Sequence, residues 1–303
     1  MFIRKVINKL KREWYKYQVD HCPKNILSEK YRKTFGHEIN WGNPQDLNEK
    51  IQWLQVYSDT SEWSRLTDKY LCREFIREKG YEHLLVDLLG VYHSAEEIDY
   101  DAMPEKFVLK CNHDSGSTQI IDKSKGFDKE AINRNLNSHL KVKFGYLGCE
   151  PHYNTIKPLI IAEEFLEDNQ TTFSSSAVDY KVFCFNGKPH IIWAAYNRTK
   201  QSVETDSYDL NWNFLPDYYG ENNHYLKGKG IVPRPKCLDE MIKVASDLST
   251  GFPQVRVDFY EINGRLYFGE MTFTSNCGRM PFFSQKALDK MGKLIDLSIA
   301  PKR

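Results

Sequence analysis

The stretch VRVDFYEINGRLYFGEMTF, residues 255–273, decides the fold of this chain. Apolar residues at positions 255, 257 and 259 alternate with Arg256 and Asp258. One face of this first strand is therefore apolar, and the other presents an arginine and a carboxylate. Asn263-Gly264 is a strong turn signal, and a second apolar run follows it. The stretch predicts a β-hairpin with one buried face and one face that carries charge.

The second strand of this hairpin carries Glu270 inside an apolar run. A carboxylate in such a run is costly unless it is paired, hydrogen-bonded or bound to a metal. A two-residue turn would set Asp258 opposite Gly269 and turn Glu270 to the other face. We predict instead a bulge made by a three-residue loop, 262–264, with Gly264 in the left-handed region, which shifts the register by one.

Two carboxylates at facing strand positions suit a magnesium ion. Mg²⁺ takes oxygen ligands and commonly uses one or two carboxylates together with phosphates. The alternative is a purely structural ion pair of Arg256 with Asp258 or Glu270. The hairpin alone leaves both interpretations open.

The rest of the chain mixes helical and strand patterns without a regular βαβ alternation, which predicts an α+β fold. Helices are expected over 47–57 with Asp46 as the N-cap, and over 67–79, 129–142, 238–248 and 284–297. Strands are expected near 106–110, 118–121, 158–166, 178–185 and 190–196. The polar and aromatic region 197–236 is read as a long loop, of the kind that is functional or disordered.

Composition limits the class of protein. The chain has 303 residues, with 42 Lys and Arg against 41 Asp and Glu, so it lacks the basic excess of a general nucleic-acid binder. Aromatic residues make up 14%, which suits contact with sugars and equally suits ordinary packing. The seven cysteines form no CxxC pair, which argues against a zinc site and favours a reducing cytoplasm. No apolar run is long enough to cross a membrane.

Residues 1–18 predict a basic amphipathic helix. Apolar residues recur at helical spacing, and six Lys or Arg residues accompany them. Such a helix could lie on the anionic inner surface of a membrane. The alternative is a helix that packs on its own domain.

Lysines elsewhere add candidate phosphate contacts. Lys110 ends an apolar strand and precedes the loop 112–118, which contains Ser115 and Gly116. Backbone N–H groups of such a loop can hold phosphates, although the P-loop pattern GxxxxGK[ST] is absent. Lys69 and Lys181 are further candidates, and for each lysine alone a solvated side chain is the simpler interpretation. The strand 160–167 turns acidic as it ends, which suits an adenine and ribose site.

Taken together and in order, these segments resemble the ATP-grasp superfamily, and within it the TupA-like branch that is related to teichuronopeptide and polysaccharide biosynthesis. The resemblance extends from about Tyr31 to Pro281. It rests on LNEKI (47–51), TDKY (67–70), FVLKCNHDSG (107–116), AEEF (162–165), DYKV (179–182), GFP (251–253), VRVDFY (255–260) and GEMTFT (269–274).

The resemblance implies a fold of two α+β subdomains that clasp ATP, preceded by a helical N-terminal region. It implies a helical region over 1–60 and an ATP-grasp domain over 61–303, with a lid subdomain at about 106–166 and a catalytic subdomain at about 177–303. ATP and Mg²⁺ are the implied cofactors.

The resemblance also implies roles for single residues. The cofactor-binding residues would be Lys69, Lys110, Ser115, Gly116, Glu163, Glu164, Phe165, Leu166, Asp179 and Lys181. Arg256 and Lys181 would act on the transferred phosphate, and Asp258 and Glu270 would bind Mg²⁺. Many ATP-grasp enzymes carry Asn two residues after this glutamate. Here Thr272 stands there, so the third metal ligand is Thr272, Asn276 or water.

The implied reaction is carboxylate–amine ligation through an acyl phosphate. In this branch the carboxylate would belong to a uronic acid in a surface glycan such as a capsule, and the amine to an amino acid or another amine. Arg198, Lys200, Asn276 and Arg279 are the candidate substrate contacts. The alternatives are a glycan kinase and a glycosyltransferase of the same pathway. The expected location is the cytoplasm, with contact to the inner membrane surface through residues 1–18.

Overall fold

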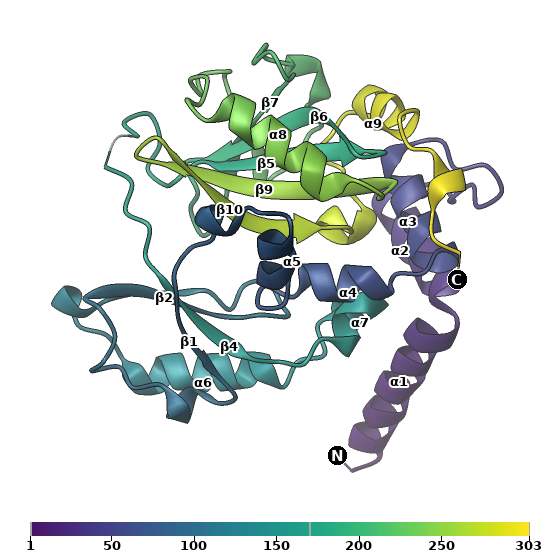
Figure 1. Cartoon of the computed structure of the whole chain (residues 1–303). Coiled ribbons are helices and arrows are strands. Elements are labelled where there is room, and N and C mark those ends of the chain that lie inside the picture. Colours follow the sequence, from purple (N-terminus) through teal and green to yellow (C-terminus); the bar gives the residue numbers. More distant parts are fainter. Residues whose placement is uncertain (1, 170, 303) are drawn as a thin grey trace.

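The computed structural model describes residues 2–169 and 171–302, which form two β-sheets with helices packed around them (Figure 1). The smaller sheet has the strand order β1–β4–β2–β3 and consists of β1 (Leu88–Tyr92), β2 (Lys106–Cys111), β3 (Gln119–Asp122) and β4 (Ile160–Glu164). The larger sheet has the order β10–β9–β5–β6–β7–β8 and consists of β5 (Asp179–Phe185), β6 (Lys188–Tyr196), β7 (Val203–Tyr208), β8 (Tyr225–Lys227), β9 (Gln254–Ile262) and β10 (Arg265–Thr272). Neighbouring strands are antiparallel except β7 and β8. The α+β prediction is confirmed.

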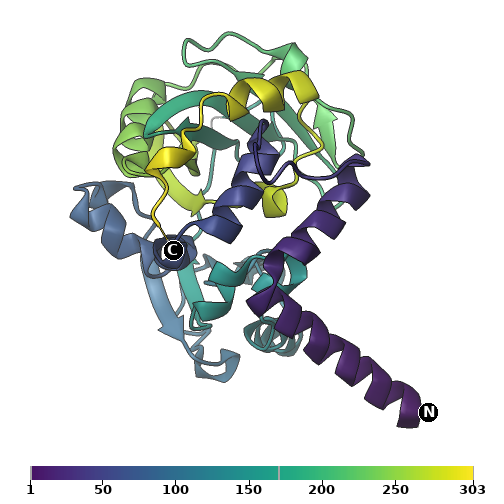
Figure 2. The ribbon, with the colours of Figure 1, turned by 90° about the vertical axis from the view of Figure 1, so that its right-hand side faces the viewer.

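Helices cover both sheets. They are α1 (Phe2–His21), α2 (Pro23–Phe35), α3 (Leu47–Tyr57), α4 (Ser61–Thr67), α5 (Cys72–Glu78), α6 (Lys129–Leu140), α7 (Gly145–Gly148), α8 (Leu238–Ser249) and α9 (Gln285–Gly292). Apolar residues of α8 pack on one face of the large sheet, and those of α3 and α9 pack on the other face. Leu136 of α6 joins the core of the small sheet. Figure 2 shows α1 leaving the body of the molecule at the N-terminus.

The small sheet includes β1, which lies upstream of the lid range 106–166 expected from the sequence. The division into a helical region and two subdomains stays a prediction. Two separate sheets, joined by the segment between β4 and β5, are the feature of the fold that positions the site.

In the final hairpin Asp258 and Glu270 face each other as predicted, but the register shift that brings them together does not lie in the turn. Ile262 pairs with Arg265 across a two-residue turn, in which Asn263 has φ 53° and Gly264 has φ 78°. The predicted three-residue loop is therefore wrong. The register shifts further along, between Phe268 and Glu270, so that Glu270 lies opposite Asp258.

Core packing explains this bulge. Before it, Leu266 and Phe268 face the buried cluster under α8, and after it Met271 and Phe273 do. One extra residue reverses the alternation, so apolar side chains stay buried on both sides of Gly269. A Cβ atom at Gly269 would lie 3.0 Å from the carbonyl oxygen of Asp258, which favours glycine there.

Predicted helices are right where local signals suffice. The helix over 47–57 is present, and the Asp46 side chain caps it by accepting from the backbone N–H of Glu49 at 2.8 Å. The predicted helix over 67–79 is wrong: α4 ends at Thr67 and α5 begins at Cys72. Between them Asp68 accepts the backbone N–H groups of Tyr70 and Leu71, which forms a turn in place of a helix.

Two further expectations need correction. The region 197–236 is not one loop, because β7 and β8 lie within it. The predicted helix over 284–297 is shorter and ends at Gly292. Gly292 packs against the chain at Gln45, whose carbonyl oxygen would lie 2.2 Å from an added Cβ atom.

The N-terminal amphipathic prediction is confirmed as a helix from Phe2 onward, and Met1 lies outside the described residues. No helix in the described part of the chain is long and apolar enough to cross a bilayer.

Candidate functional site

A cavity of about 660 Å³ lies between the two sheets. Strands β2 and β4 of the small sheet and β5, β9 and β10 of the large sheet all contribute lining residues. This volume suits a nucleotide or a similar ligand. Successive side chains of a strand point to opposite faces of the sheet. In these strands one set of alternate side chains faces the core, and the polar side chains of the other set face the cavity.

Lys69 reaches the cavity because the helix breaks before it. Asp68 is held in the turn by the amide of Asn112, at 2.9 Å. The Lys69 backbone N–H donates to the carbonyl of Asn112, and its ammonium donates to the carbonyl of Asp114 at 2.6 Å. Burial raises the pKa of Asp68, against the hydrogen bonds it accepts. The break thus ties Lys69 to the loop 112–118.

The loop 112–118 is braced at its base and open at its tip. Asp114 accepts from the Ser117 hydroxyl at 2.5 Å and contacts His139 at 2.5 Å. The tip, Ser115-Gly116, is exposed and lines the cavity. Gly116 has φ +95°, and nothing lies within 4 Å of where its Cβ would be. Such a loop can present backbone N–H groups to a phosphate.

Lys110 and Glu163 form a close ion pair across the small sheet, with 2.5 Å between Nζ and Oε2. Arg73 contacts the other oxygen of Glu163 at 3.5 Å and donates to the carbonyl of Val86. Glu163 is therefore a shared partner of two cations at the wall of the cavity. The next residues, Glu164, Phe165 and Leu166, also line the cavity as the chain leaves β4 toward the large sheet.

Asp258 is the centre of the charge cluster on the large sheet. Arg256 donates to both of its oxygens, at 2.6 and 2.7 Å, and Lys181 donates at 2.6 Å. Lys181 also contacts Asp179 at 2.5 Å. Lys181 lies opposite Asp258 between β5 and β9, and Arg256 and Asp179 each lie two positions away along one of these strands, on the same face.

The charges in this cluster set one another's pKa values. Burial alone would raise the pKa of Asp258, but Arg256 and Lys181 outweigh burial and lower it. Burial alone would lower the pKa of Lys181, but Asp179 and Asp258 raise it. Burial raises the pKa of Asp179 against the attraction of Lys181, and the charge of Asp258 raises it further. Lys181 and Asp258 therefore stay ionised at neutral pH.

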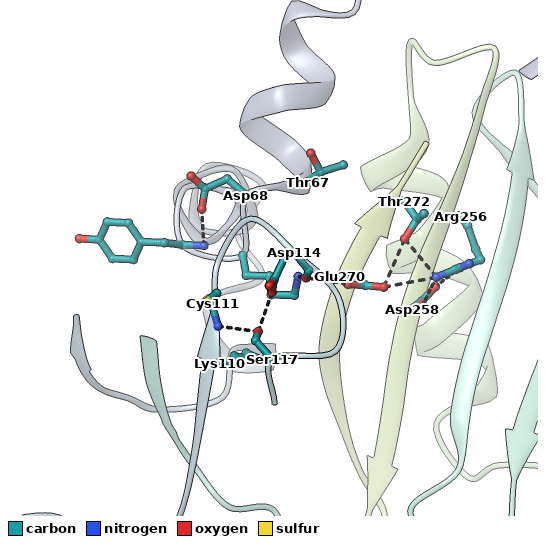
Figure 3. A network of polar contacts seen from close by, with 12 residues as sticks. Thr67, Asp68, Lys110, Cys111, Asp114, Ser117, Arg256, Asp258, Glu270 and Thr272 are labelled. Carbon is teal, nitrogen blue, oxygen red and sulfur yellow. Dashed lines mark hydrogen bonds and ion pairs between the residues drawn. The ribbon is translucent and has the colours of Figure 1, made fainter. Parts of the chain in front are cut away.

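Glu270 is the link between the two halves of the site (Figure 3). Its Oε1 lies 3.3 Å from Arg256 and 3.3 Å from the Thr272 hydroxyl, and its Oε2 lies 4.0 Å from Lys69. Figure 3 shows the Glu270 carboxylate between the loop that bears Asp114 and the Arg256–Asp258 pair. Its side chain is 38% exposed, whereas that of Asp258 is 2% exposed.

The expected substrate contacts are only partly gathered. Asn276 lines the cavity. Arg198, Lys200 and Arg279 are not among the described residues that line it. Arg198 lies 3.5 Å from Asp179, and Arg279 donates to the carbonyl of Cys277.

Several lining residues were missed by sequence reasoning: Arg73, Phe144, Glu150, Tyr153, Tyr225, Tyr260, Thr274 and Cys277. Glu150 is buried, accepts from the hydroxyl of Thr274, and has its pKa raised by burial. Neighbours distant in the chain bring these residues to the cavity. Of these residues, only Tyr260 has a signal in the sequence, because it continues the alternation of Arg256 and Asp258 along β9.

The residues present fit a magnesium ion and a triphosphate. Asp179 Oδ1 is buried and accepts no hydrogen bond within the described chain, so an acceptor is left for a ligand. Glu270 is half-exposed and holds only long contacts. No group of three His, Cys, Asp or Glu side chains spaced to hold a metal occurs in residues 2–169 and 171–302. The protein would supply the carboxylates of Asp258 and Glu270 and the hydroxyl of Thr272, with phosphate and water completing the coordination of Mg²⁺.

Comparison with protein families finds a match to the TupA-like ATPgrasp model over residues 49–296. Comparison with curated proteins finds no match. Many solved structures are similar. One is the D-alanine–D-alanine ligase from Bacillus anthracis complexed with ATP, at 15% identity and a TM-score of 0.42, covering 72% of this chain and 58% of that one.

Two other structures are similar at the same level. The D-alanine–D-alanine ligase from Helicobacter pylori has 12% identity and a TM-score of 0.43, covering 83% of this chain and 67% of that one. The ATP-grasp ligase PsnB, complexed with a phosphomimetic variant of a minimal precursor, Mg and ADP, has 11% identity and a TM-score of 0.42, covering 92% and 73%. The chain spans 58% of the length of the first structure. Similarity at this level carries no information on substrates.

Proposed function

The chain belongs to the TupA-like ATP-grasp family, and from that premise we propose that it is an ATP- and Mg²⁺-dependent ligase that joins a carboxylate to an amine. The observation that carries the proposal is the meeting of cations from both sheets with Asp258 and Glu270 in one cavity. Lys69 and Lys110 come from one side of it, and Lys181 and Arg256 come from the other. Such a set suits a polyphosphate with its metal and not a neutral ligand.

The wall of the cavity supplies the nucleotide contacts in this proposal. Backbone and side chains of Glu163 to Leu166 hold the adenine and ribose, where the chain passes from β4 toward the large sheet. Lys69, Lys110 and the N–H groups of Ser115-Gly116 hold the phosphates. Lys110 is already at the cavity wall, because Glu163 orients it at 2.5 Å.

Asp258, Glu270 and Thr272 would hold Mg²⁺, which neutralises charge on phosphate oxygens when it is bound. Arg256 orients Asp258 through two hydrogen bonds and contacts Glu270, so one guanidinium fixes both carboxylates. Lys181 and Arg256 also offer positive charge to the phosphoryl group in transfer. Because both are buried, little reorganisation is needed at the moment of reaction.

The chemistry proceeds in two steps. A carboxylate oxygen of the first substrate attacks the γ-phosphorus of ATP, and the bond to ADP breaks, which forms an acyl phosphate. The amine of the second substrate then attacks the acyl carbon, phosphate leaves, and the nitrogen loses a proton to form the amide. The residues act by positioning and by charge neutralisation, and no covalent protein nucleophile is needed.

We assign the carboxylate to a uronic acid of a surface glycan, in polysaccharide biosynthesis. Three aromatic side chains, Phe144, Tyr153 and Tyr225, line the same cavity and suit stacking on sugar rings. Glu150 and Asn276 also line it. An amino acid or another amine is the second substrate.

A trapping experiment tests the reaction. The enzyme is supplied with ATP, Mg²⁺ and a uronic-acid glycan, with hydroxylamine in place of the amine. A hydroxamate, formed only with all components, is the expected product. ADP release with a stable phosphorylated sugar and no hydroxamate would establish a glycan kinase instead. In a parallel reaction with a nucleotide sugar in place of ATP, transfer of the sugar to the glycan would establish a glycosyltransferase.

A further inference from the structure

The N-terminal helix α1 carries an apolar stripe that is exposed. Ile7 is 45% exposed, Leu10 64%, Trp14 60% and Tyr17 50%. Their spacing of three, four and three residues sets them on one face of the helix. The Trp14 and Tyr17 rings stack at 5.5 Å. These four large apolar side chains form one exposed apolar patch, which is a feature of surfaces that bind a partner or a membrane.

The stripe faces away from the rest of the chain. The helix is held to the body through Val19, which is fully buried, and through Tyr15, whose hydroxyl donates to the carbonyl of Tyr146 at 3.0 Å. At 3.6 residues per turn, the direction of Tyr15 and Val19 lies roughly 140° from the centre of the stripe. Figures 1 and 2 both show α1 extending from the body at the N-terminal end. The described chain therefore does not cover the stripe.

Positive charge is concentrated on this helix. Residues 1–21 contain six Lys or Arg and two Asp or Glu, so their net charge is 6 − 2 = +4. The whole chain has a net charge of +1, so residues 22–303 carry 1 − 4 = −3. The two acids are engaged within the chain. Glu13 pairs with Lys16 at 3.1 Å and Arg12 at 3.4 Å, and Asp20 accepts from the Tyr146 hydroxyl.

We propose that α1 docks on an anionic lipid surface, with Ile7, Leu10, Trp14 and Tyr17 inserted at the headgroup level. Basic side chains beside an apolar stripe are the pattern of helices that lie in the membrane interface. Tyr and Trp rings favour this boundary because each has an apolar body and a polar tip. This docking is independent of the reaction proposed for the cavity.

Charge favours a lipid surface over a second copy of the chain. Pairing of two α1 stripes would bring two helices of net charge +4 together. The acids that would have to compensate are already paired, with Lys16 and Arg12 in one case and with Tyr146 in the other. An anionic bilayer supplies the missing negative charge, and each basic residue near it adds to the attraction.

Flotation of the full chain with lipid vesicles tests the proposal. Vesicles of phosphatidylcholine alone are compared with vesicles that also contain phosphatidylglycerol. Binding is expected to the anionic vesicles, to fall with added salt, and to be weak on phosphatidylcholine. Ile7→Ser and Ile299→Ser form a matched pair, because both isoleucines are 45% exposed. Ile7→Ser should weaken partitioning on the order of tenfold, and Ile299→Ser should leave it unchanged.

A second matched pair of variants tests the contribution of charge. Lys11→Gln on the helix should weaken binding to anionic vesicles, and Lys125→Gln, at an exposed site on the small-sheet side, should not. Thermal unfolding should be the same for all four variants, since each changes an exposed side chain. Absence of binding to anionic vesicles at low salt would overturn the proposal. So would equal loss in Ile7→Ser and Ile299→Ser, or a lipid-free dimer that Ile7→Ser dissociates in sedimentation velocity.

Discussion

Replacing Asp258 by Asn removes the negative charge at the centre of the buried cluster, and replacing Glu270 by Gln removes the facing one. The two carboxylates lie opposite each other on β9 and β10, and both are proposed metal ligands. Their surroundings differ. We expect both variants to lose ATP turnover and only Asp258→Asn to lose substantial stability.

The contacts set the size of the difference. Asp258 accepts three hydrogen bonds from cations, at 2.6, 2.6 and 2.7 Å, and its side chain is 2% exposed. In the Asp258→Asn variant the new amide N–H group would face these donors, and Arg256 and Lys181 would lose their central counter-ion. Breaking a buried ion pair in this way costs about 3–5 kcal/mol. Asp179 also contacts Lys181, so the low end, about 3 kcal/mol, is expected.

Glu270 is different because it is 38% exposed and its contacts with Arg256 and Lys69 are 3.3 and 4.0 Å. Exposed ion pairs contribute about 0–1 kcal/mol. Glu270→Gln should therefore unfold close to the wild type. The pKa of Asp258 is lowered in the folded chain, so its stabilisation is present at neutral pH and is lost as the pH falls through that lowered value.

Urea unfolding at neutral pH gives the free energy of unfolding for the wild type and both variants, and ATP turnover with Mg²⁺ gives the activity. The reasoning is refuted if Asp258→Asn is as stable as the wild type, or if Glu270→Gln loses as much stability as Asp258→Asn. Retained turnover in Glu270→Gln would refute its assignment to the metal.

Three further predictions concern the bulge, a buried histidine and a phosphate contact. Gly269→Ala should destabilise the chain by about 1–3 kcal/mol and reduce activity, because its Cβ would lie 3.0 Å from a carbonyl oxygen of β9; Gly42→Ala, with 3.9 Å of clearance, is the control in thermal unfolding. Burial lowers the pKa of His152 from 6.5 to about 3, so between these values the unfolded chain binds a proton that the folded chain does not. Stability should therefore fall as the pH drops below 6.5, by about tenfold in the unfolding constant per pH unit, and His152→Phe should reduce this loss in urea titrations. Lys110→Met should lower kcat roughly 10²-fold, whereas Lys106→Met on the same strand, in an exposed ion pair, should not.

Each of these has a contrary outcome. Equal melting temperatures for the two glycine variants would show that β10 keeps its register without Gly269. An unchanged acid limb in His152→Phe would assign the loss to other groups. Equal effects of the two lysine variants would remove Lys110 from the phosphate site.

Local patterns in the sequence were enough for most of the strands, although not for β7 and β8, and for the N-cap of α3. Alternation at 255–259 predicted which face of β9 is buried, and Asp46 predicted the start of α3. The facing of Asp258 and Glu270 was also predicted, from the cost of an unpaired acid among apolar residues. The buried face of β9 and the cap of α3 depend on neighbours within a few residues, so their physical causes are present in the sequence itself.

Tertiary contacts decided how those elements make a site. The pattern over 67–79 predicts one helix, yet Asn112, far along the chain, holds Asp68 in a turn and directs Lys69 to the loop 112–118. The register of the hairpin is set by a bulge at Gly269 and not by the turn. The reason is that apolar side chains on both sides of this bulge are buried under α8.

The sequence by itself determined an α+β chain whose final hairpin has one buried face and one charged face, with a basic amphipathic helix at the N-terminus. Periods of 2 and 3.6 residues carry that information, since they follow from local backbone geometry. Only the tertiary structure decided that Lys69, Lys110, Glu150 and the acids of the hairpin share one cavity. It also decided that the stripe of α1 faces outward. Both depend on packing between segments that are distant in the chain, and the periodicity of the sequence does not indicate which segments pack together.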